Sequence, residues 1–482
     1  MRNPLAFLLL ACFFALLINC NKEPDFTDIN NNNTNNNNNN NNNPDLTPPA
    51  GTKYIPPSTQ RSGNAAAGYE YLVSGDYISS GIPYNIFSNI PGMRDNSNRL
   101  GRTGDNATIP HDFTAVTAPN GVRVVAPNCL QCHAGFVNGN FIVGLGNSAA
   151  DFSSDQSALA SLASLLILPG TPEYDAFLPF KKAFQAVAPH IVSEVRGANV
   201  ADKLGAVLAA HRDKETLVWN DNPSISIPSE VVITDVPPWW VLKKKNAMFY
   251  AGNGRGDFSR YLMASSLLTM QDSSKANEVN QRFPDVLAYI LSLEPPPYPG
   301  IINDSLAEKG RLIFNQTCAK CHGTYGPGGQ YPNLLVPLEE VKTDPLLSNA
   351  YQSSTYEAFK QWFNTGWFGR NPNGAQLVAE GGYVAQPLDG IWASAPYLHN
   401  GSIPTLEDLL NSQQRPTYWK RTFNDTDYDF VKVGWKYTTP ASKIDKETYD
   451  TTLPGYGNQG HYYGDPLTPE QRAAVIEYLK TL

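Results

Sequence analysis

The sequence contains two copies of a five-residue pattern in which two cysteines and a histidine are closely spaced. The copies are C-L-Q-C-H at 129–133 and C-A-K-C-H at 318–322. Both match C-x-x-C-H, the attachment sequence of a c-type haem. Cysteines one helical turn apart can reach the two vinyl groups of one porphyrin, and the adjoining histidine then becomes an axial ligand of the iron. One copy alone can arise by chance or as half of a zinc site, but two copies predict two covalently attached haem c groups.

The cysteines outside these motifs leave no pair for a structural disulfide in the folded body. The six cysteines of the chain are Cys12, Cys20, Cys129, Cys132, Cys318 and Cys321. The last four belong to the motifs, in which His133 and His322 are the expected proximal iron ligands. The first two lie in a leader segment. We therefore expect covalent haems to stabilise the fold where an exported protein would otherwise use disulfides.

Residues 1–20 have the organisation of an export signal. Arg2 supplies the positive charge, and the apolar core over 5–18 is shorter than a typical membrane span. The segment ends in Leu-Ile-Asn-Cys, which is similar to a bacterial lipobox, so we predict a lipoprotein that is lipidated at Cys20. Asn19 stands where lipoboxes have Gly or Ala, which keeps ordinary secretion as an alternative. The folded body would face the periplasm or the cell surface, held to a membrane by its lipid anchor.

The segment after this signal, residues 21–60, is predicted to be a disordered tether. Residues 30–43 are Asn throughout except Thr34, and prolines are frequent in the segment that follows. Such a composition cannot bury apolar surface. The full chain has 482 residues, 41% of them hydrophobic, which is enough for two or three domains. Its formal charge of −8 and the lack of a basic cluster argue against a nucleic-acid partner.

We predict a mainly α fold with two cytochrome c-like haem domains. The first covers 61–298 and carries large helical insertions, and the second covers 299–482. The boundary falls at the proline-rich segment 295–299, because stacked prolines cannot continue a helix. An Asn-Gly pair at 138–139, between two apolar runs, predicts a β-hairpin directly after the first motif.

The group on the second axial face of each iron decides what that iron can do. The internal methionines all precede the second motif, so its haem is expected to take a histidine from its own domain. His399 and His461 are the candidates. We predict His461, because flanking glycines let its loop approach a porphyrin closely. A His/His iron has a lower potential than a His/Met iron. No residue stands out for the first haem, and an open or weakly ligated face is expected there.

Two further segments are candidates for function. The stiff Pro-Pro-Trp-Trp segment at 237–240 could hold an indole between two haems, so Trp240 is a candidate for an electron path, with core packing as the alternative. Lys243–Lys245 either pairs with haem propionates or forms a solvated basic turn.

The stretch G-I-W-x-x-A-P-Y-L-H-N-G at 390–401, followed by T-L-E-D at 405–408, resembles the bacterial di-haem cytochrome c peroxidase superfamily. The long first domain, the missing Met ligand and the G-H-Y-x-G ending at 460–464 look closer to its rubber-oxygenase-like branch. This resemblance implies that one haem is the reaction site and the other relays electrons. It also implies that His461 is the late axial ligand of the second haem. Trp240 and His399 are our candidate catalytic residues.

These observations predict an exported di-haem oxidoreductase. Peroxide or dioxygen would react at the first haem, and the second haem would relay electrons exchanged with a donor or acceptor protein. The alternative is a non-enzymatic electron carrier in which both irons are six-coordinate. An open axial face separates the two readings.

Overall fold

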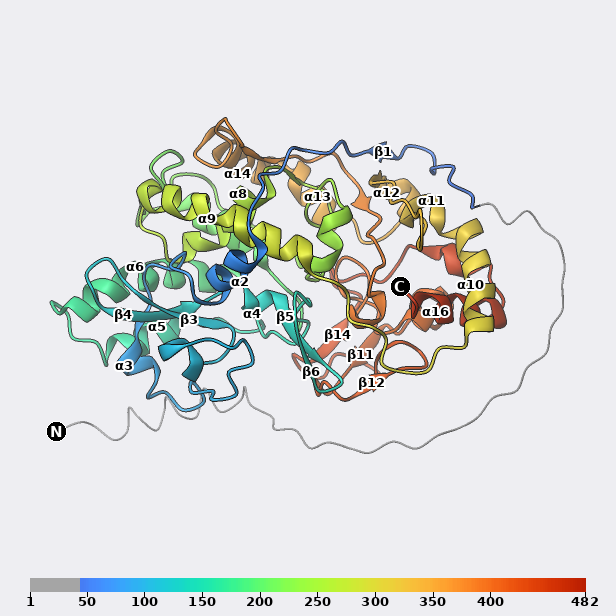
Figure 1. The fold of residues 1–482 in the computed structure, drawn as a ribbon, viewed down its shortest axis with the longest axis horizontal. Helices are drawn as coiled ribbons and strands as arrows, with labels where there is room; N and C mark the ends of the chain where they lie inside the picture. The colour runs from blue at the N-terminus through green and yellow to red at the C-terminus, as the bar shows by residue number, and fades with distance from the viewer. Residues whose placement is uncertain (1–43) are drawn as a thin grey trace.

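The computed structural model describes residues 44–482 (Figure 1). The predicted signal at 1–20, its Cys20 lipidation site and most of the predicted tether lie outside the described residues. Within residues 44–482, no helix is both long and apolar enough to cross a membrane.

The secondary structure is mixed rather than mainly α. Helices account for 37% and strands for 12% of the described residues, so the predicted fold class is wrong. The strands belong to six small antiparallel sheets in the described part of the chain. They are two to five residues long, too short for alternating hydrophobicity to stand out in the sequence. Several pair with distant partners, such as β1 with β8, which single-sequence patterns do not reveal.

Eight helices in the described residues have eight or more residues. They are α2 (Ala65–Ser74), α5 (Ser157–Ser164), α6 (Pro172–Val187), α7 (Ala201–Ala210), α9 (Ser273–Ser292), α10 (Asp304–Thr317), α14 (Ser354–Thr365) and α16 (Pro469–Leu479). The shorter α-helices are α3 (Tyr84–Phe87), α4 (Leu130–His133), α8 (Phe258–Leu262), α11 (Ala319–His322), α12 (Leu338–Val341), α13 (Leu346–Gln352) and α15 (Leu406–Leu409). Short 3₁₀ turns include η4 (Trp239–Lys244) and η8 (Tyr462–Gly464).

The strands pair only over short stretches. The three-stranded sheets are β1 (Lys53–Tyr54), β8 (Leu334–Val336) and β10 (Tyr383–Val384), and β2 (Ile82–Pro83), β4 (Arg123–Pro127) and β3 (Phe113–Thr117). The two-stranded sheets are β5 (Ala134–Val137) with β6 (Asn140–Val143), β7 (Gly254–Gly256) with β9 (Ala375–Leu377), β11 (Tyr418–Lys420) with β14 (Thr448–Asp450), and β12 (Tyr428–Asp429) with β13 (Gly434–Trp435). The predicted hairpin after the first motif is confirmed as β5–β6. Asn138 and Gly139 turn the chain there with φ of 50° and 76°.

Two pairs of helices pack closely, α2 with α9 and α10 with α16, and the second pair includes the helix that leads into the second motif (Figure 1). A glycine allows the close approach in each pair. A Cβ atom on Gly68 would lie 1.9 Å from the carbonyl oxygen of Asp285, and one on Gly310 would lie 1.9 Å from that of Ala474. The chain therefore contains two glycine-contact helix pairs and two short helices that each end in a motif histidine.

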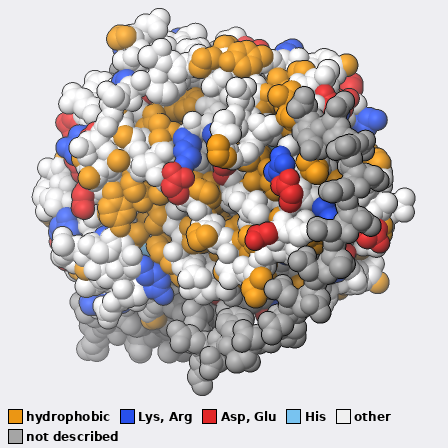
Figure 2. Space-filling view, turned by 45° about the vertical axis from the view of Figure 1, so that its right-hand side comes forward, with side chains coloured by type: hydrophobic (Ala, Val, Ile, Leu, Met, Phe, Trp, Pro, Cys, Tyr) orange, Lys and Arg blue, Asp and Glu red, His pale blue; other side chains and the backbone are white. Residues whose placement is uncertain are grey.

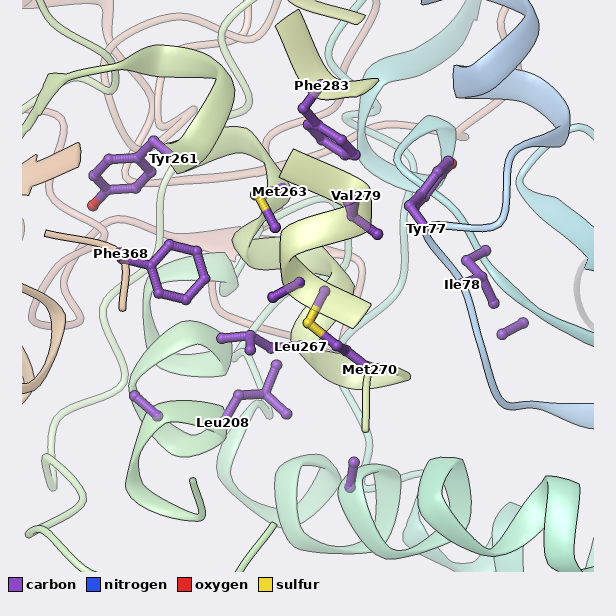
Figure 3. Packing of buried hydrophobic residues seen from close by; sticks show 14 of the residues in the cluster. Tyr77, Ile78, Leu208, Tyr261, Met263, Leu267, Met270, Val279, Phe283 and Phe368 are labelled. Carbon is purple, nitrogen blue, oxygen red and sulfur yellow. The ribbon is translucent and has the colours of Figure 1, made fainter. Parts of the chain in front are cut away.

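Two large hydrophobic clusters form the interior. The larger packs α2, α6, α7, α9 and α14 together, and Met263 and Met270 lie among its side chains (Figure 3). The second surrounds Trp240, Phe314 and Trp392 and includes the buried face of α16. On the surface shown in Figure 2, acidic and basic side chains lie next to one another between apolar patches. The domain boundary at residue 298 stays a prediction.

Candidate haem sites

The second motif forms a single turn of helix immediately after α10. The amide nitrogens of Cys321 and His322 donate to the carbonyl oxygen of Cys318 at 3.1 and 3.0 Å, which places the two thiols one turn apart. Gly323 ends the turn with φ of 78°. Burial raises the pKa of the Cys318 thiol to about 12 and that of Cys321 to about 11. Both thiols and the histidine line one cavity.

A hydrogen bond to a backbone carbonyl oxygen holds the His322 ring on its Nδ1 side. Its Nδ1 lies 2.8 Å from the carbonyl oxygen of Gln386, so this nitrogen acts as the donor. Burial lowers the pKa of the imidazole, which keeps the ring neutral. The other nitrogen, Nε2, is therefore left with its lone pair available. A hydrogen bond of this kind is the usual way in which a metal-binding histidine is oriented.

His461 lies across from His322. The ring centroids are 6.1 Å apart and the ring planes differ by 61°. Two imidazoles that bind one metal ion at about 2 Å per metal–nitrogen bond have centroids roughly 6 Å apart. Burial, the largest cause, and nearby His322 lower the pKa of His461 to about 3, so this ring is also neutral. The spacing and the neutral state suit two axial ligands of one iron.

The backbone around His461 is held in an unusual conformation by contacts from distant segments. His461 adopts φ of 50°, and its amide donates to the carbonyl oxygen of Val341 at 2.7 Å. A Cβ atom on Gly460 would lie 2.3 Å from the backbone of Lys342, so only glycine fits there. The Arg415 guanidinium donates to the carbonyl oxygens of Asn458, Gly460 and His461 on this loop, and to those of Asp408 and Leu409.

The cavity between the two imidazoles has a volume of about 190 Å³ and a mostly apolar lining. Its walls come from α10, α11, α16, the 383–399 segment and the 235–241 segment. Two thiols on one turn, an imidazole beside them, a second imidazole on the far side and an apolar lining fit the donor set of a covalently bound haem c.

His399, Asp235 and Tyr250 also line this cavity. His399 is buried, stacks on Tyr383 with centroids 4.0 Å apart, and has its pKa lowered by burial to about 3. Its carbonyl oxygen accepts from the amide of Asp235 at 2.6 Å. Tyr250 Oη donates to Asp235 Oδ2 at 3.1 Å. Both predicted candidates, His399 and His461, thus line the cavity, but only His461 is paired ring to ring with His322.

The first motif has the same local geometry as the second. The amide of His133 donates to the carbonyl oxygen of Cys129 at 3.1 Å, and α4 leads directly into β5. His133 is partly buried, and burial lowers its pKa to about 3. Its Nδ1 is a buried nitrogen without a hydrogen-bond partner in residues 44–482. The Cys132 thiol accepts from Asn199 Nδ2 at 3.3 Å. The cavity at the second motif and a smaller one beside Trp419 include no residue of this motif.

The Trp239–Trp240 pair connects the surroundings of the two motifs. The Trp239 ring stacks on the imidazole of His133, with centroids 4.5 Å apart and an interplanar angle of 19°. Trp240 is 1% exposed, and its indole N–H donates to the carbonyl oxygen of Asp389 at 2.7 Å. Asp389 lines the cavity at the second motif. Trp239 therefore contacts the first motif histidine, and its neighbour Trp240 contacts the wall of the second site.

The three lysines after this pair all contact protein groups. Lys243 pairs with Glu294 at 2.6 Å and Lys244 with Asp389 at 2.7 Å. Lys245 is buried, donates to Gln386 Oε1 at 2.6 Å and pairs with no carboxylate in the described residues. Burial lowers its pKa to about 7. Lys245 thus supports the residue whose carbonyl oxygen holds His322.

Sequence reasoning missed the residues that hold the histidines. Gln386, Arg415, Lys245 and Asp235 act through contacts that join segments distant in the chain, so no local pattern marks them. Trp239 was noted only as a neighbour of Trp240, although it is the residue that touches His133.

Residues 382–420 match the family described as RoxA-like, cytochrome c-like. The matched segment contains β10 and the 390–401 stretch, and it forms one wall of the cavity at the second motif. The match supports the rubber-oxygenase-like branch of cytochromes and haem c as the cofactor. It includes neither C-x-x-C-H motif.

Two proteins of Sinorhizobium fredii (strain NBRC 101917 / NGR234) are similar in sequence. Uncharacterized protein y4iM is 26% identical over 311 residues, which cover 56% of this chain and 69% of the relative. Uncharacterized protein y4iJ is 29% identical over 255 residues, which cover 39% of this chain and 41% of the relative. The chain thus matches less than half of the second relative, and neither name gives an activity.

Proposed function

We propose that the chain is an exported di-haem oxidoreductase with one haem c at each C-x-x-C-H motif. The observation that carries the proposal is the cavity at the second motif. Two thiols and His322 line it, and His461 stands opposite with ring centroids 6.1 Å apart. The match of residues 382–420 to a RoxA-like, cytochrome c-like family agrees with this assignment.

A haem at the first motif is supported by repetition. Both motifs form one helical turn with the same amide-to-carbonyl contact, and the chain contains two helix pairs that each meet at a glycine. Haem c supplies one-electron transfer and, where an axial position is free, a binding site for peroxide or dioxygen.

The protein residues have distinct proposed roles. His322 and His461 would be the two protein ligands of a haem iron at the second site, which would suit electron transfer rather than binding of peroxide or dioxygen. Trp239 and Trp240 provide an aromatic connection from His133 to the wall of the second site. His399 is a proposed site residue of the second cavity. The apolar lining excludes water from that cavity.

The surroundings of the protein are also proposals. Lipidation at Cys20 would anchor it to a membrane, with residues 61–298 and 299–482 as its two haem-carrying regions outside the cytoplasm. A redox protein would exchange electrons with it, and peroxide or dioxygen would be consumed at the first site. Among the described residues, the ring that stacks on His133 belongs to Trp239, whereas the ring that faces His322 belongs to His461. The position for peroxide or dioxygen is therefore proposed at the first site.

Electron paramagnetic resonance and optical spectra of the purified, oxidised full-length protein test the proposal. We expect one high-spin ferric signal that cyanide perturbs, and one low-spin signal that it does not. A variant with Cys129→Ala and Cys132→Ala should lose the high-spin signal and keep the low-spin one. The matched variant with Cys318→Ala and Cys321→Ala should do the reverse. Two low-spin haems that ignore cyanide would instead establish the non-enzymatic electron carrier.

A further inference from the structure

The small cavity beside Trp419 has a buried arginine in its wall. Its volume is about 10 Å³, which is close to the space that a single water-sized particle needs. Pro396 lines both this cavity and the larger one at the second motif. The side chains in its lining that carry a charge at neutral pH are Arg196, Arg421 and Glu447. We call this cavity, with these three side chains, the arginine cavity.

Arg421 has more hydrogen-bond donors than the protein satisfies. The residue is 5% exposed. Its hydrogen bonds to described residues are both made by Nη2, which donates to the carbonyl oxygen and to the hydroxyl of Ser148. The guanidinium also lies over the rings of Phe423 and Trp435, 4.4 and 4.3 Å from their centroids. An aromatic ring attracts the charge but supplies no lone pair, so the N–H groups of Nε and Nη1 have no protein acceptor in residues 44–482.

Two other buried arginines show how this fold satisfies a guanidinium that has no carboxylate partner in the described residues. Arg102 is 6% exposed and Arg212 is 2% exposed. Each donates from Nη1 and Nη2 to three backbone carbonyl oxygens, and only Nε is left over. Arg421 differs from both, because Nη1 is left over as well and the side chain lines a cavity.

The charges in the lining of the arginine cavity are positive on balance. The Arg196 guanidinium lies 4.3 Å from the centroid of the Phe423 ring, which Arg421 also contacts. Glu447 is shared between two cations, since it pairs with Arg196 at 3.3 Å and with Lys420 at 3.1 Å. A buried cation without a partner is costly, and buried donors normally have acceptors. A second guanidinium beside the unused donors therefore points to a bound anion.

The Arg421 guanidinium keeps its charge at neutral pH. Burial, the largest cause, and nearby Arg196 lower its pKa to about 9, while the Asp235 carboxyl acts in the opposite direction. Asp235 forms no ion pair with Arg421 in the described part of the chain, and its carboxyl accepts from Tyr250 Oη at 3.1 Å instead. The unused N–H groups of Arg421 are thus available to a ligand.

We propose that the arginine cavity binds one small monovalent anion of halide size, such as chloride. Nε and Nη1 of Arg421 donate to the anion, and Arg196 supplies a second positive charge. The anion thereby links Arg421 to the segment that contains Ser148 and Arg196, which follows the first motif in the chain. This inference goes beyond the proposed function, because it requires no haem at either motif.

Urea unfolding of the purified full-length holoprotein at constant ionic strength tests the proposal. Sodium chloride is replaced stepwise by sodium gluconate, whose anion is too large for a cavity of this volume. Chloride at roughly ten times its dissociation constant should raise the equilibrium constant for folding about elevenfold, and the dependence should follow a single-site binding curve. Crystals grown in sodium bromide should show an anomalous bromine peak beside Arg421.

Two variants and one control assign the effect to the arginine cavity. Arg421→Met removes both the donors and the charge, so it should abolish the chloride dependence and the bromine peak. Arg196→Met should weaken the dependence, and it serves as the second variant if Arg421→Met does not fold. Arg102→Met is the matched control, because it removes another buried guanidinium that lies outside the cavity lining. It should lower stability and keep the full chloride dependence.

The absence of a bromine peak at Arg421 would overturn the inference and leave a cavity that holds only water. A chloride dependence of the same size in the unaltered protein and in Arg421→Met would also overturn it, because the anion would then act at another place.

Discussion

Replacing His461 with glycine should remove an axial ligand while leaving the fold intact. His461 is the residue that lies opposite His322, with ring centroids 6.1 Å apart. Its backbone has φ of 50°, in the left-handed region where a side chain is unfavourable. The contacts that hold this loop run from Arg415 to carbonyl oxygens and from the His461 amide to Val341, so all of them survive the substitution.

The size of the effect on stability follows from two opposing terms. A non-glycine residue in the left-handed conformation costs roughly 1–2 kcal/mol. Glycine avoids that cost but loses about 0.5–1 kcal/mol through its greater freedom in the unfolded chain. The backbone contribution of His461→Gly should therefore be within about 1 kcal/mol of zero, or slightly stabilising. The variant should fold, and a change in its spectrum reports the lost ligand rather than unfolding.

Electron paramagnetic resonance should show the low-spin signal of the second haem converted to high spin in His461→Gly. Added imidazole should restore the low-spin signal, because it can enter the space left by the side chain. His399→Gly is the matched control and should leave the low-spin signal in place. A low-spin signal that persists in His461→Gly and disappears in His399→Gly would refute the ligand assignment.

Three further predictions concern residues around the pair. Arg415→Met removes a partly buried guanidinium that donates to five carbonyl oxygens. Chemical denaturation should show an unfolding free energy lower by about 3 kcal/mol, and a loss below about 1 kcal/mol would contradict the role given to this loop contact. Lys245→Met removes a buried positive charge next to the support of His322 and should lower the midpoint potential of the second haem. Because the pKa of Lys245 is about 7, this difference should be present below pH 7 and fade above it, whereas a pH-independent difference would point to a purely structural effect. Trp240→Phe should slow electron transfer between the haems in stopped-flow reduction without changing haem content, and an unchanged rate would leave core packing as its role.

The features predicted well from the sequence are those set by neighbouring residues. The β5–β6 hairpin follows from an Asn-Gly pair, because both residues accept positive φ. The assignment of His461 as an iron ligand stays a prediction, and its ring centroid lies 6.1 Å from that of His322.

The features that escaped prediction depend on contacts between distant segments. The mixed fold arises from short strands that pair with distant segments. In β1, for example, Lys53 pairs with Leu335 of β8, and β10 adds to the other edge of β8. The Arg415 guanidinium donates to the carbonyl oxygen of His461, and the carbonyl oxygen of Gln386 accepts from the His322 ring. Every residue has a backbone carbonyl oxygen, so no local pattern in the sequence marks these contacts. The buried state of Asp235 likewise depends on the whole fold.

The number of covalent haems tests the central claim most directly. Intact-mass spectrometry and the pyridine haemochrome assay should give two haems per chain in the full protein. They should give one in each variant whose motif cysteines are replaced, either Cys129 with Cys132 or Cys318 with Cys321. One haem in the full protein, retained when Cys129 and Cys132 are replaced, would contradict a haem at the first motif and with it the di-haem oxidoreductase.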